Sequence, residues 1–295
     1  MERRSHMDGQ GAAIMIAFAA TLAVNQVVVK LTNAGLQPVF QTGVRSLIGL
    51  AALMLWMRWR GIRWHITPGT VRSGILMGLV FSGEFVFLFQ ALDLTTVGRS
   101  SVIFYSMPVW LALAGHFLLP AERMSLTKAI GLALAMAGVI WAMLDRGAGV
   151  GNWKGDLFAL VAAMNWAAIA LISRITPLAQ EKIEMQLWWQ LAISALVLLA
   201  LSPLFGPFRR DFNVLHGVSV LGQGVIVVFA MFLLWFRMIK LYPASSIASF
   251  SFLSPIFGVL MGWLLLGEPL GRGVLVALGL VACGLVLINW PRRSA

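Results

Sequence analysis

The sequence predicts an all-α membrane protein of ten transmembrane helices in two inverted five-helix repeats. Composition is the first observation behind this prediction. Hydrophobic residues make up 60% of the 295 residues and charged residues only 11%, whereas soluble proteins carry about a quarter charged residues. The second is a series of apolar segments of roughly 20 residues, the length that crosses a bilayer. The third is a similarity between the two halves of the chain.

The first half supplies five apolar segments. The first starts at Gly11, and the second ends before a basic loop that runs from Arg58 to Arg72. The third is apolar except for Glu84, the fourth has a Ser- and Thr-rich start, and the fifth carries a glycine, Gly138. We expect helices at residues 10–31, 38–57, 71–91, 97–119 and 126–144.

The second half supplies five more segments. The first of them reaches Arg174, the next starts among polar residues, and the third contains Gln223 between two glycines. The fourth is rich in serine before Pro255, and the last is rich in glycine. We expect helices at residues 155–175, 184–202, 215–238, 242–266 and 271–290.

These helices use most of the chain and leave no room for a soluble catalytic domain. What remains is short connections and two tails. The expected divisions are an N-terminal tail 1–9, a first repeat 10–144, a connecting loop 145–154, a second repeat 155–290 and a C-terminal tail 291–295.

The net charge of +11, from 22 basic and 11 acidic residues, is interpreted as a record of membrane topology. In a soluble protein it would suggest a nucleic-acid partner, but here the basic residues separate apolar runs. If both termini are cytoplasmic, the inside segments hold about twice as many basic residues as the outside ones, as the positive-inside rule requires. We therefore expect cytoplasmic termini, contacts with lipids and no nucleic-acid partner.

The two halves of the chain resemble each other. Leu92–Pro108 and Ile239–Pro255 align at an offset of 147, and a glutamate follows each segment, at Glu122 and Glu268. Because five is odd, the second repeat must cross the membrane in the opposite sense to the first. Inverted repeats are typical of secondary transporters, whose similar halves can exchange conformations. The alternative is duplication in a scaffold or channel protein.

The repeated pattern combines a Ser- and Thr-rich helix entry, a proline, a glutamate and a glycine-rich final helix. It resembles the EamA module of the drug/metabolite transporter superfamily and occurs twice, at residues 91–144 and 238–290. The resemblance implies an inner-membrane protein that exports small metabolites by alternating access. Within the superfamily the chain is most similar to the YddG-type exporters, which implies amino-acid substrates, aromatic ones among them. The alternatives are a multidrug or other metabolite exporter of the same fold, and less favoured, a channel or a membrane-embedded enzyme.

Glu84 is the most conspicuous polar residue of the expected spans, because it lies in the middle of an apolar helix. Polar side chains are costly in hydrocarbon and usually face the bundle interior or a wet cavity. A carboxyl group there could relay protons, bind the ammonium group of a substrate, or stay neutral and hydrogen-bonded to a neighbouring helix. Its counterpart in the second repeat is Met231, so any such role belongs to one repeat only.

Other polar and aromatic residues fall on the expected helices where they could line a substrate cavity. Helix 97–119 places Ser101 and Tyr105 on one face with Pro108. An aromatic ring with hydroxyl and amide groups would suit an amino acid, although such serines often serve close packing instead. The candidate substrate-binding residues are Glu84, Tyr105, Ser101, Asn25, Asn165, Trp166, Gln223, Ser245, Ser249 and Phe252, and the candidate hinges are Pro108 and Pro255.

The sequence contains no phosphate-binding loop, zinc-protease motif or paired carboxylates at one depth. We therefore expect no enzymatic activity, cofactor or metal site, and a small-molecule substrate as the partner. We also expect the protein to function as a monomer.

Overall fold

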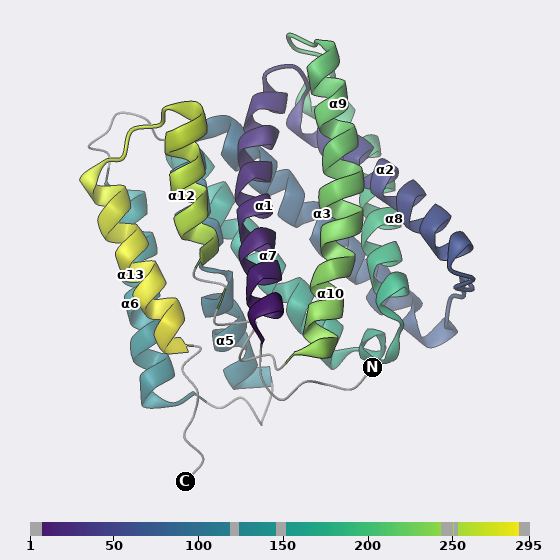
Figure 1. The fold of residues 1–295 in the computed structure, drawn as a ribbon, viewed down its shortest axis with the longest axis horizontal. Coiled ribbons are helices and arrows are strands. Elements are labelled where there is room, and N and C mark those ends of the chain that lie inside the picture. The colour runs from purple at the N-terminus through teal and green to yellow at the C-terminus, as the bar shows by residue number, and fades with distance from the viewer. Residues whose placement is uncertain (1–7, 119–123, 146–151, 243–249, 251–252, 289–295) are drawn as a thin grey trace.

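The computed structural model describes residues 8–118, 124–145, 152–242, 250 and 253–288, and these residues form a bundle of helices (Figure 1). Within these ranges the chain forms no strand, and its one isolated β-bridge joins Leu36 to Arg209. Among the described residues, eight helical segments are long and apolar enough to cross a membrane. Two shorter apolar helices follow them, at Leu253–Leu266 and Arg272–Ile288. The protein is therefore an all-helical, multi-pass membrane protein.

The helices of the first half begin and end close to the expected residues. The structure places α1 at Gly9–Asn33, α2 at Pro38–Trp59, α3 at Val71–Leu94, α4 at Val97–Phe104, α5 at Met107–Leu118 and α6 at Leu126–Leu144. Side-chain oxygens of Asp8, Gln37 and Ser125 accept hydrogen bonds from the first turns of α1, α2 and α6. These caps satisfy backbone donors that a helix leaves free at its start.

The second half follows the expected ranges as far as the structure describes it. Its helices are α7 at Trp153–Ile175, α8 at Ile183–Leu201, α9 at Val214–Gly222, α10 at Phe232–Leu241, α12 at Leu253–Leu266 and α13 at Arg272–Ile288. Between α9 and α10 the chain forms a π-helix, η5, at Gln223–Met231. Short 3-10 turns lie at Pro68–Thr70, Pro177–Gln180 and Ser202–Phe205.

The expected helix 97–119 is interrupted just before Pro108. The chain leaves the helix at Tyr105 and Ser106, and Pro108 is the second residue of the new helix α5. A proline in the first turn loses no hydrogen bond, because the first N–H groups of a helix have no partner within it. Pro255 is likewise the third residue of α12. Both prolines therefore start helices, and a hinge role for them stays a prediction.

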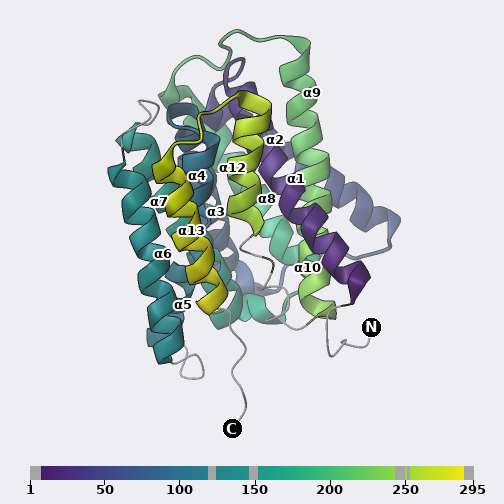
Figure 2. The same cartoon turned by 60° about the vertical axis from the view of Figure 1, so that its left-hand side comes forward.

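Helices of the first half pack mainly against helices of the second. The helix α3 packs on α7 and α8, α2 on α8 and η5, α1 on α12, and α6 on α13. Figure 2 shows α6 and α13 lying together at one side of the bundle. Glycines permit this approach, since a methyl group added at Gly131 would lie 2.8 Å from the carbonyl oxygen of Gly284. The two halves are interleaved and share one interior.

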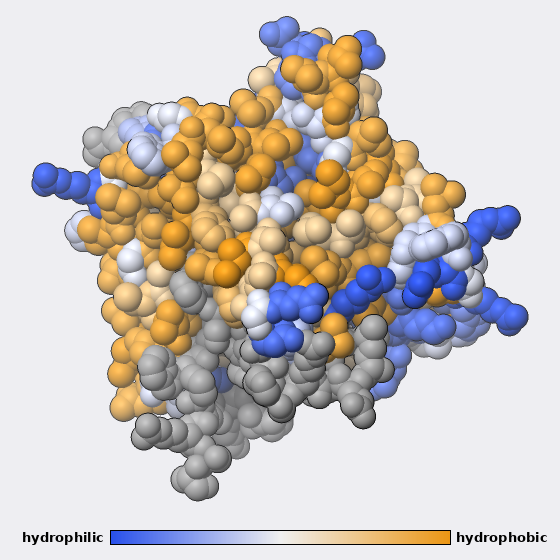
Figure 3. Space-filling view, viewed as in Figure 1, coloured by the Kyte–Doolittle hydropathy of each residue, from blue (hydrophilic) through white to orange (hydrophobic). Residues whose placement is uncertain are grey.

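The surface carries large hydrophobic side chains along the helices, as expected where lipid is the solvent. Leu55 is 70% exposed, Phe117 76% and Leu126 78%. Figure 3 shows one face covered mostly by hydrophobic residues, with hydrophilic residues above α9 and at the edge where α2 ends. The interior is rich in aromatic rings, and its largest cluster includes Phe81, Phe85, Phe89, Phe104 and Tyr105.

Candidate functional site

Arg45, on α2, is buried in the bundle and makes no hydrogen bond to another described residue. Only 1% of its surface is exposed, and its Nε and one terminal nitrogen, Nη2, have no hydrogen-bond partner. The guanidinium carbon lies 4.2 Å from the ring centroid of Phe85 and 4.6 Å from that of Phe89. The two rings hold the guanidinium group by cation–π contacts, but they supply no counter-charge.

The packing of α2 explains why this charge points inward. Arg45 shares the buried face of the helix with Thr42, Ser46 and Gly49. Gly49 and Gly224 let α2 and η5 approach closely, because added methyl groups would clash with Val228 and Ile48 respectively. Arg45 is seven residues past the start of α2, about 10 Å along its axis. It therefore lies inside an apolar helix long enough to cross a membrane, and its side chain is buried in the bundle.

Further unpaired polar atoms lie on α2 and on two segments that pack against it, α1 and η5. Both side-chain polar atoms of Gln41, one turn before Arg45, lack a partner, and so do the side-chain oxygens of Asn33, Ser46 and Gln223. Asn33 donates to the carbonyl oxygen of Phe89 over 3.1 Å, and Gln223 donates to Thr32 over 3.4 Å. Buried polar groups are nearly always hydrogen-bonded in proteins. We call Asn33, Gln41, Arg45, Ser46 and Gln223 the Arg45 cluster.

Glu84, on α3, is buried as expected, with 3% of its surface exposed. Arg45 is the charged group that acts on it electrostatically, but the two side chains form no direct ion pair. Glu84 is ten residues before the end of α3, about 15 Å along the helix and near the middle of a bilayer. Next to it, Gly83 lies against the side-chain oxygen of Asn165, whose amide group donates to Val161.

Ser101 and Tyr105 lie one helical turn apart, and both interact with other side chains of the protein. Ser101 donates to the side-chain oxygen of Gln26 over 2.6 Å, and the Tyr105 hydroxyl group lies near the side chains of Ser254 and Gln26. Ser101 also lies directly against Gly258 of α12. These residues connect α1, α4 and α12, and Ser101 is bonded within the protein.

The remaining candidates divide into two groups. Asn25 is half-buried with an unpaired side-chain oxygen, and Trp166 packs against the aromatic cluster of the interior. Three candidates, Ser245, Ser249 and Phe252, lie outside the described residues.

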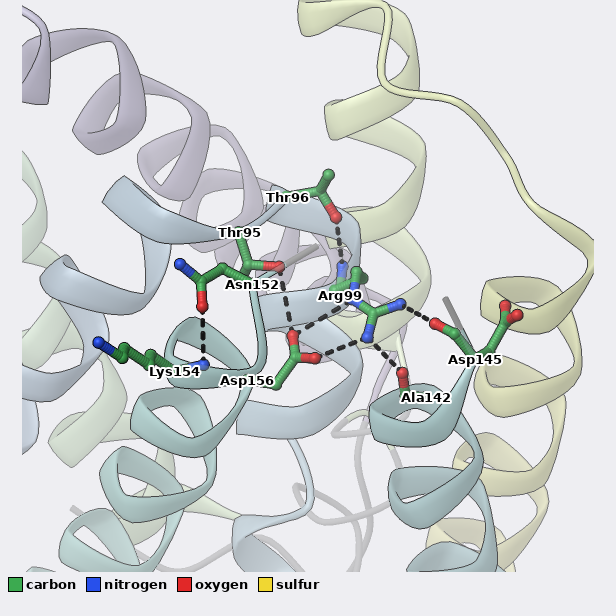
Figure 4. A network of polar contacts seen from close by, with 8 residues as sticks. All are labelled: Thr95, Thr96, Arg99, Ala142, Asp145, Asn152, Lys154 and Asp156. Atoms are coloured by element: carbon green, nitrogen blue, oxygen red, sulfur yellow. Dashed lines mark hydrogen bonds and ion pairs between the residues drawn. The ribbon is translucent and has the colours of Figure 1, made fainter. Parts of the chain in front are cut away.

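A second buried arginine, Arg99, belongs to a network that is fully bonded (Figure 4). Its Nε and Nη2 donate to the carboxylate of Asp156 over 3.2 and 2.6 Å. Its terminal nitrogens also donate to the carbonyl oxygens of Asp145 and Ala142 at the end of α6, and Thr95 donates to Asp156. The network ties the start of α4 to the end of α6 and the start of α7.

Glu268 joins the two halves at the start of α4. Its two carboxylate oxygens accept hydrogen bonds from the backbone N–H groups of Val97 and Gly98, over 2.8 and 3.0 Å. A carboxylate at this position satisfies free donors and interacts favourably with the helix dipole. Nearby, the ammonium group of Lys30 donates to the carbonyl oxygens of Leu92 and Thr95 at the end of α3.

Two features of the site are difficult to recognise from the sequence. Arg45 is a charged residue well inside the expected helix 38–57, and a glutamine four residues before it, Gln41, is the signal that this face is polar. Arg99 follows Thr95 and Thr96, and only the fold places it beside Asp156. Among the described residues, no group of three or more His, Cys, Asp or Glu side chains could hold a metal ion.

Comparison with known proteins shows that the chain is similar to transporters. The family model described as the EamA-like transporter family matches residues 9–144 and again 153–290. YoaV of Bacillus subtilis (strain 168), described as an uncharacterized transporter, is 26% identical over 270 residues, which are 87% of this chain and 89% of that protein. YvbV of the same organism, also described as an uncharacterized transporter, is 28% identical over 96% of this chain and 92% of its own.

A solved crystal structure shares the fold. It is 22% identical in sequence, covers 94% of each of the two chains and superimposes with a TM-score of 0.67. The likeness extends over nearly the whole chain, and at this level of identity it concerns the fold alone.

Proposed function

The chain belongs to the EamA-like transporter family, and we propose that it is a secondary transporter that exports small metabolites, namely amino acids including aromatic ones, by alternating access. In this proposal the protein lies in the inner membrane with both termini in the cytoplasm. It crosses the membrane ten times, and its two five-helix halves are inverted with respect to each other. It works as a monomer and leaves its substrate chemically unchanged.

The observation that carries the proposal is the Arg45 cluster beside aromatic rings in the shared interior. Unpaired polar atoms there can form hydrogen bonds with a ligand, because no group of the protein bonds to them. The rings of Phe85 and Phe89 and the half-buried Trp166 offer an apolar wall. A pocket with apolar walls and a few placed polar groups suits a small amphiphile. Asn25, Asn165 and Glu84 extend the polar lining of this interior.

Counterflow in proteoliposomes tests the proposal. The purified chain is reconstituted and loaded with unlabelled amino acids, and uptake of radiolabelled amino acids is followed across a broad panel. We expect saturable exchange with at least one aromatic amino acid. No saturable exchange across the whole panel would reject the amino-acid substrate, and uptake that rises linearly with concentration would favour a channel instead.

The same vesicles, with and without an imposed pH gradient, test whether Glu84 couples transport to protons. Buried in the interior, Glu84 is placed to take up and release a proton as the two halves rearrange. We expect the wild type to respond to the gradient and Glu84→Gln to transport without responding to it. An unchanged response in Glu84→Gln would show that Glu84 has no part in coupling.

A further inference from the structure

We propose that the Arg45 cluster is the site that holds the carboxylate group of the substrate, with Arg45 as its anchor. This inference rests on the proposed transport function and deepens it, because it names the chemical group that a substrate must carry. Nothing in the family assignment specifies that group.

The first argument comes from the unpaired nitrogens themselves. Arginine stays charged at neutral pH, and a buried charge without a partner is strongly destabilising. The two nitrogens of Arg45 that lack partners, Nε and Nη2, lie on one edge of the guanidinium group. A carboxylate binds such an edge through two parallel hydrogen bonds.

The second argument is that the same molecule contains this arrangement already filled. At Arg99, Nε and Nη2 donate to the two oxygens of Asp156. The corresponding nitrogens of Arg45 face no carboxylate of the described chain. A carboxylate placed at Arg45 as Asp156 is placed at Arg99 would satisfy both of them.

The third argument concerns the groups around the guanidinium. Phe85 and Phe89 contact it through their rings, which limits its rotation while Nε and Nη2 stay without a hydrogen-bond partner. Gln41 lies one turn before Arg45 on the same helix face, and its amide group has no partner. That amide can donate to a carboxylate oxygen that Arg45 leaves free. The unpaired oxygen of Gln223 can accept from a polar substrate.

Glu84 does not fill the site, although its charge acts on Arg45. The two side chains form no direct ion pair. Its carboxyl group therefore remains available to a cationic group. The pair would suit a molecule that carries a carboxylate and an ammonium group on neighbouring atoms.

Binding to the purified full-length protein in detergent tests the site separately from transport. The probes are L-phenylalanine, 3-phenylpropionate, which lacks the ammonium group, and L-phenylalaninamide, which lacks the carboxylate. Each is titrated against the thermal unfolding of the protein, since a ligand that binds only the folded state raises the midpoint. The variants are Arg45→Gln and Arg45→Lys. The control is Arg58→Gln, which removes an equal charge from the exposed end of the same helix.

We expect both carboxylates to bind the wild type and the control about 10- to 100-fold more tightly than the amide, as charge-assisted hydrogen bonds imply. Arg45→Gln should bind acid and amide equally. Arg45→Lys keeps the charge but lacks the planar guanidinium group, so its preference for the acid should be intermediate. A wild type that binds neither carboxylate, or does not distinguish acid from amide, overturns the proposal, as does discrimination that survives in Arg45→Gln.

The proposed function can fail separately. Carboxylate binding that depends on Arg45, without exchange in vesicles, would refute transport of these compounds and leave the site standing. Saturable exchange of L-phenylalanine without a preference for the acid would refute the site and leave transport standing.

Discussion

Arg99 and Arg45 are both buried arginines in the first half of the chain, yet their surroundings are opposite. Arg99 is 6% exposed and bonded to a carboxylate and two helix-end carbonyls. Arg45 is 1% exposed and touches two aromatic rings. Arg99 links three helices, whereas Arg45 has no hydrogen-bond or ion-pair partner among the described residues.

The difference teaches how a structural charge can be told from a binding charge inside a membrane protein. Burial alone does not separate them, because both side chains are removed from the surface. What separates them is whether the hydrogen-bonding edge is occupied. Breaking the filled pair leaves an uncompensated charge, whereas removing the unpaired arginine relieves one.

The largest effect is expected where the filled pair is broken. Asp156→Asn keeps the shape of the side chain and removes the charge that neutralises Arg99. We expect the free energy of unfolding in detergent micelles to fall by about 3 to 5 kcal/mol. Asp211→Asn, in an exposed loop, is the matched control and should change it little. Equal stability of the two variants would mean that the Arg99 network contributes nothing.

A smaller loss is expected at the contact between the halves. Glu268→Gln removes the negative charge from the start of α4 and weakens its bonds to Val97 and Gly98. The expected loss is about 1 to 2 kcal/mol, measured in the same denaturation. Glu181→Gln, whose side chain caps no helix in the described structure, serves for comparison. A similar loss in both variants would argue against a specific cap.

Tyr105→Phe tests whether the hydroxyl group of Tyr105 supports the fold, in contrast to the Arg45 cluster, which we propose binds the substrate. Loss of the hydroxyl group should lower stability by about 1 kcal/mol and leave exchange of L-phenylalanine nearly unchanged. The two are measured on one preparation by thermal unfolding and by vesicle exchange. Loss of exchange at full stability would instead place the Tyr105 hydroxyl in contact with the substrate.

The smallest effect on stability is expected from Arg45→Gln. The variant removes a buried charge that has no hydrogen-bond or ion-pair partner among the described residues, and it loses only the longer-range attraction to Glu84. The free energy of unfolding should therefore change by less than about 1 kcal/mol or should rise. Without added ligand, its melting temperature should match or exceed that of the wild type. A loss of stability as large as that of Asp156→Asn would show that Arg45 supports the fold as Arg99 does.

Much of the fold could be predicted because the hydrophobicity and the length of an apolar segment can be read directly from the sequence. The expected helix 126–144 coincides with α6, and the expected helix 71–91 differs from α3 only at its end. The break at Tyr105 could not be placed, because the sequence marks it by Pro108, three residues later. The ten-span count and the inversion of the repeats stay predictions.

The candidate site was predictable only in part. A charge among apolar residues is visible in the sequence, so Glu84 was expected in the interior and is found there. Whether Arg45 would reach the interface or turn inward depended on the approach of η5 through Gly49 and Gly224. Whether Tyr105 would be free depended on Gln26 and Ser254, which come from distant helices. Such pairings arise from tertiary packing, which no local pattern specifies.

The close packing of α6 and α13 limits which substitutions this sequence can accept. Added methyl groups at Gly131, Gly138 and Gly284 would lie within 2.8 Å of backbone atoms of the facing helix, where nothing can move aside. Gly279, on the same α13, faces open space and can accept alanine. Among natural variants of this protein, position 279 should therefore be free to vary, while the three packed positions should remain glycine.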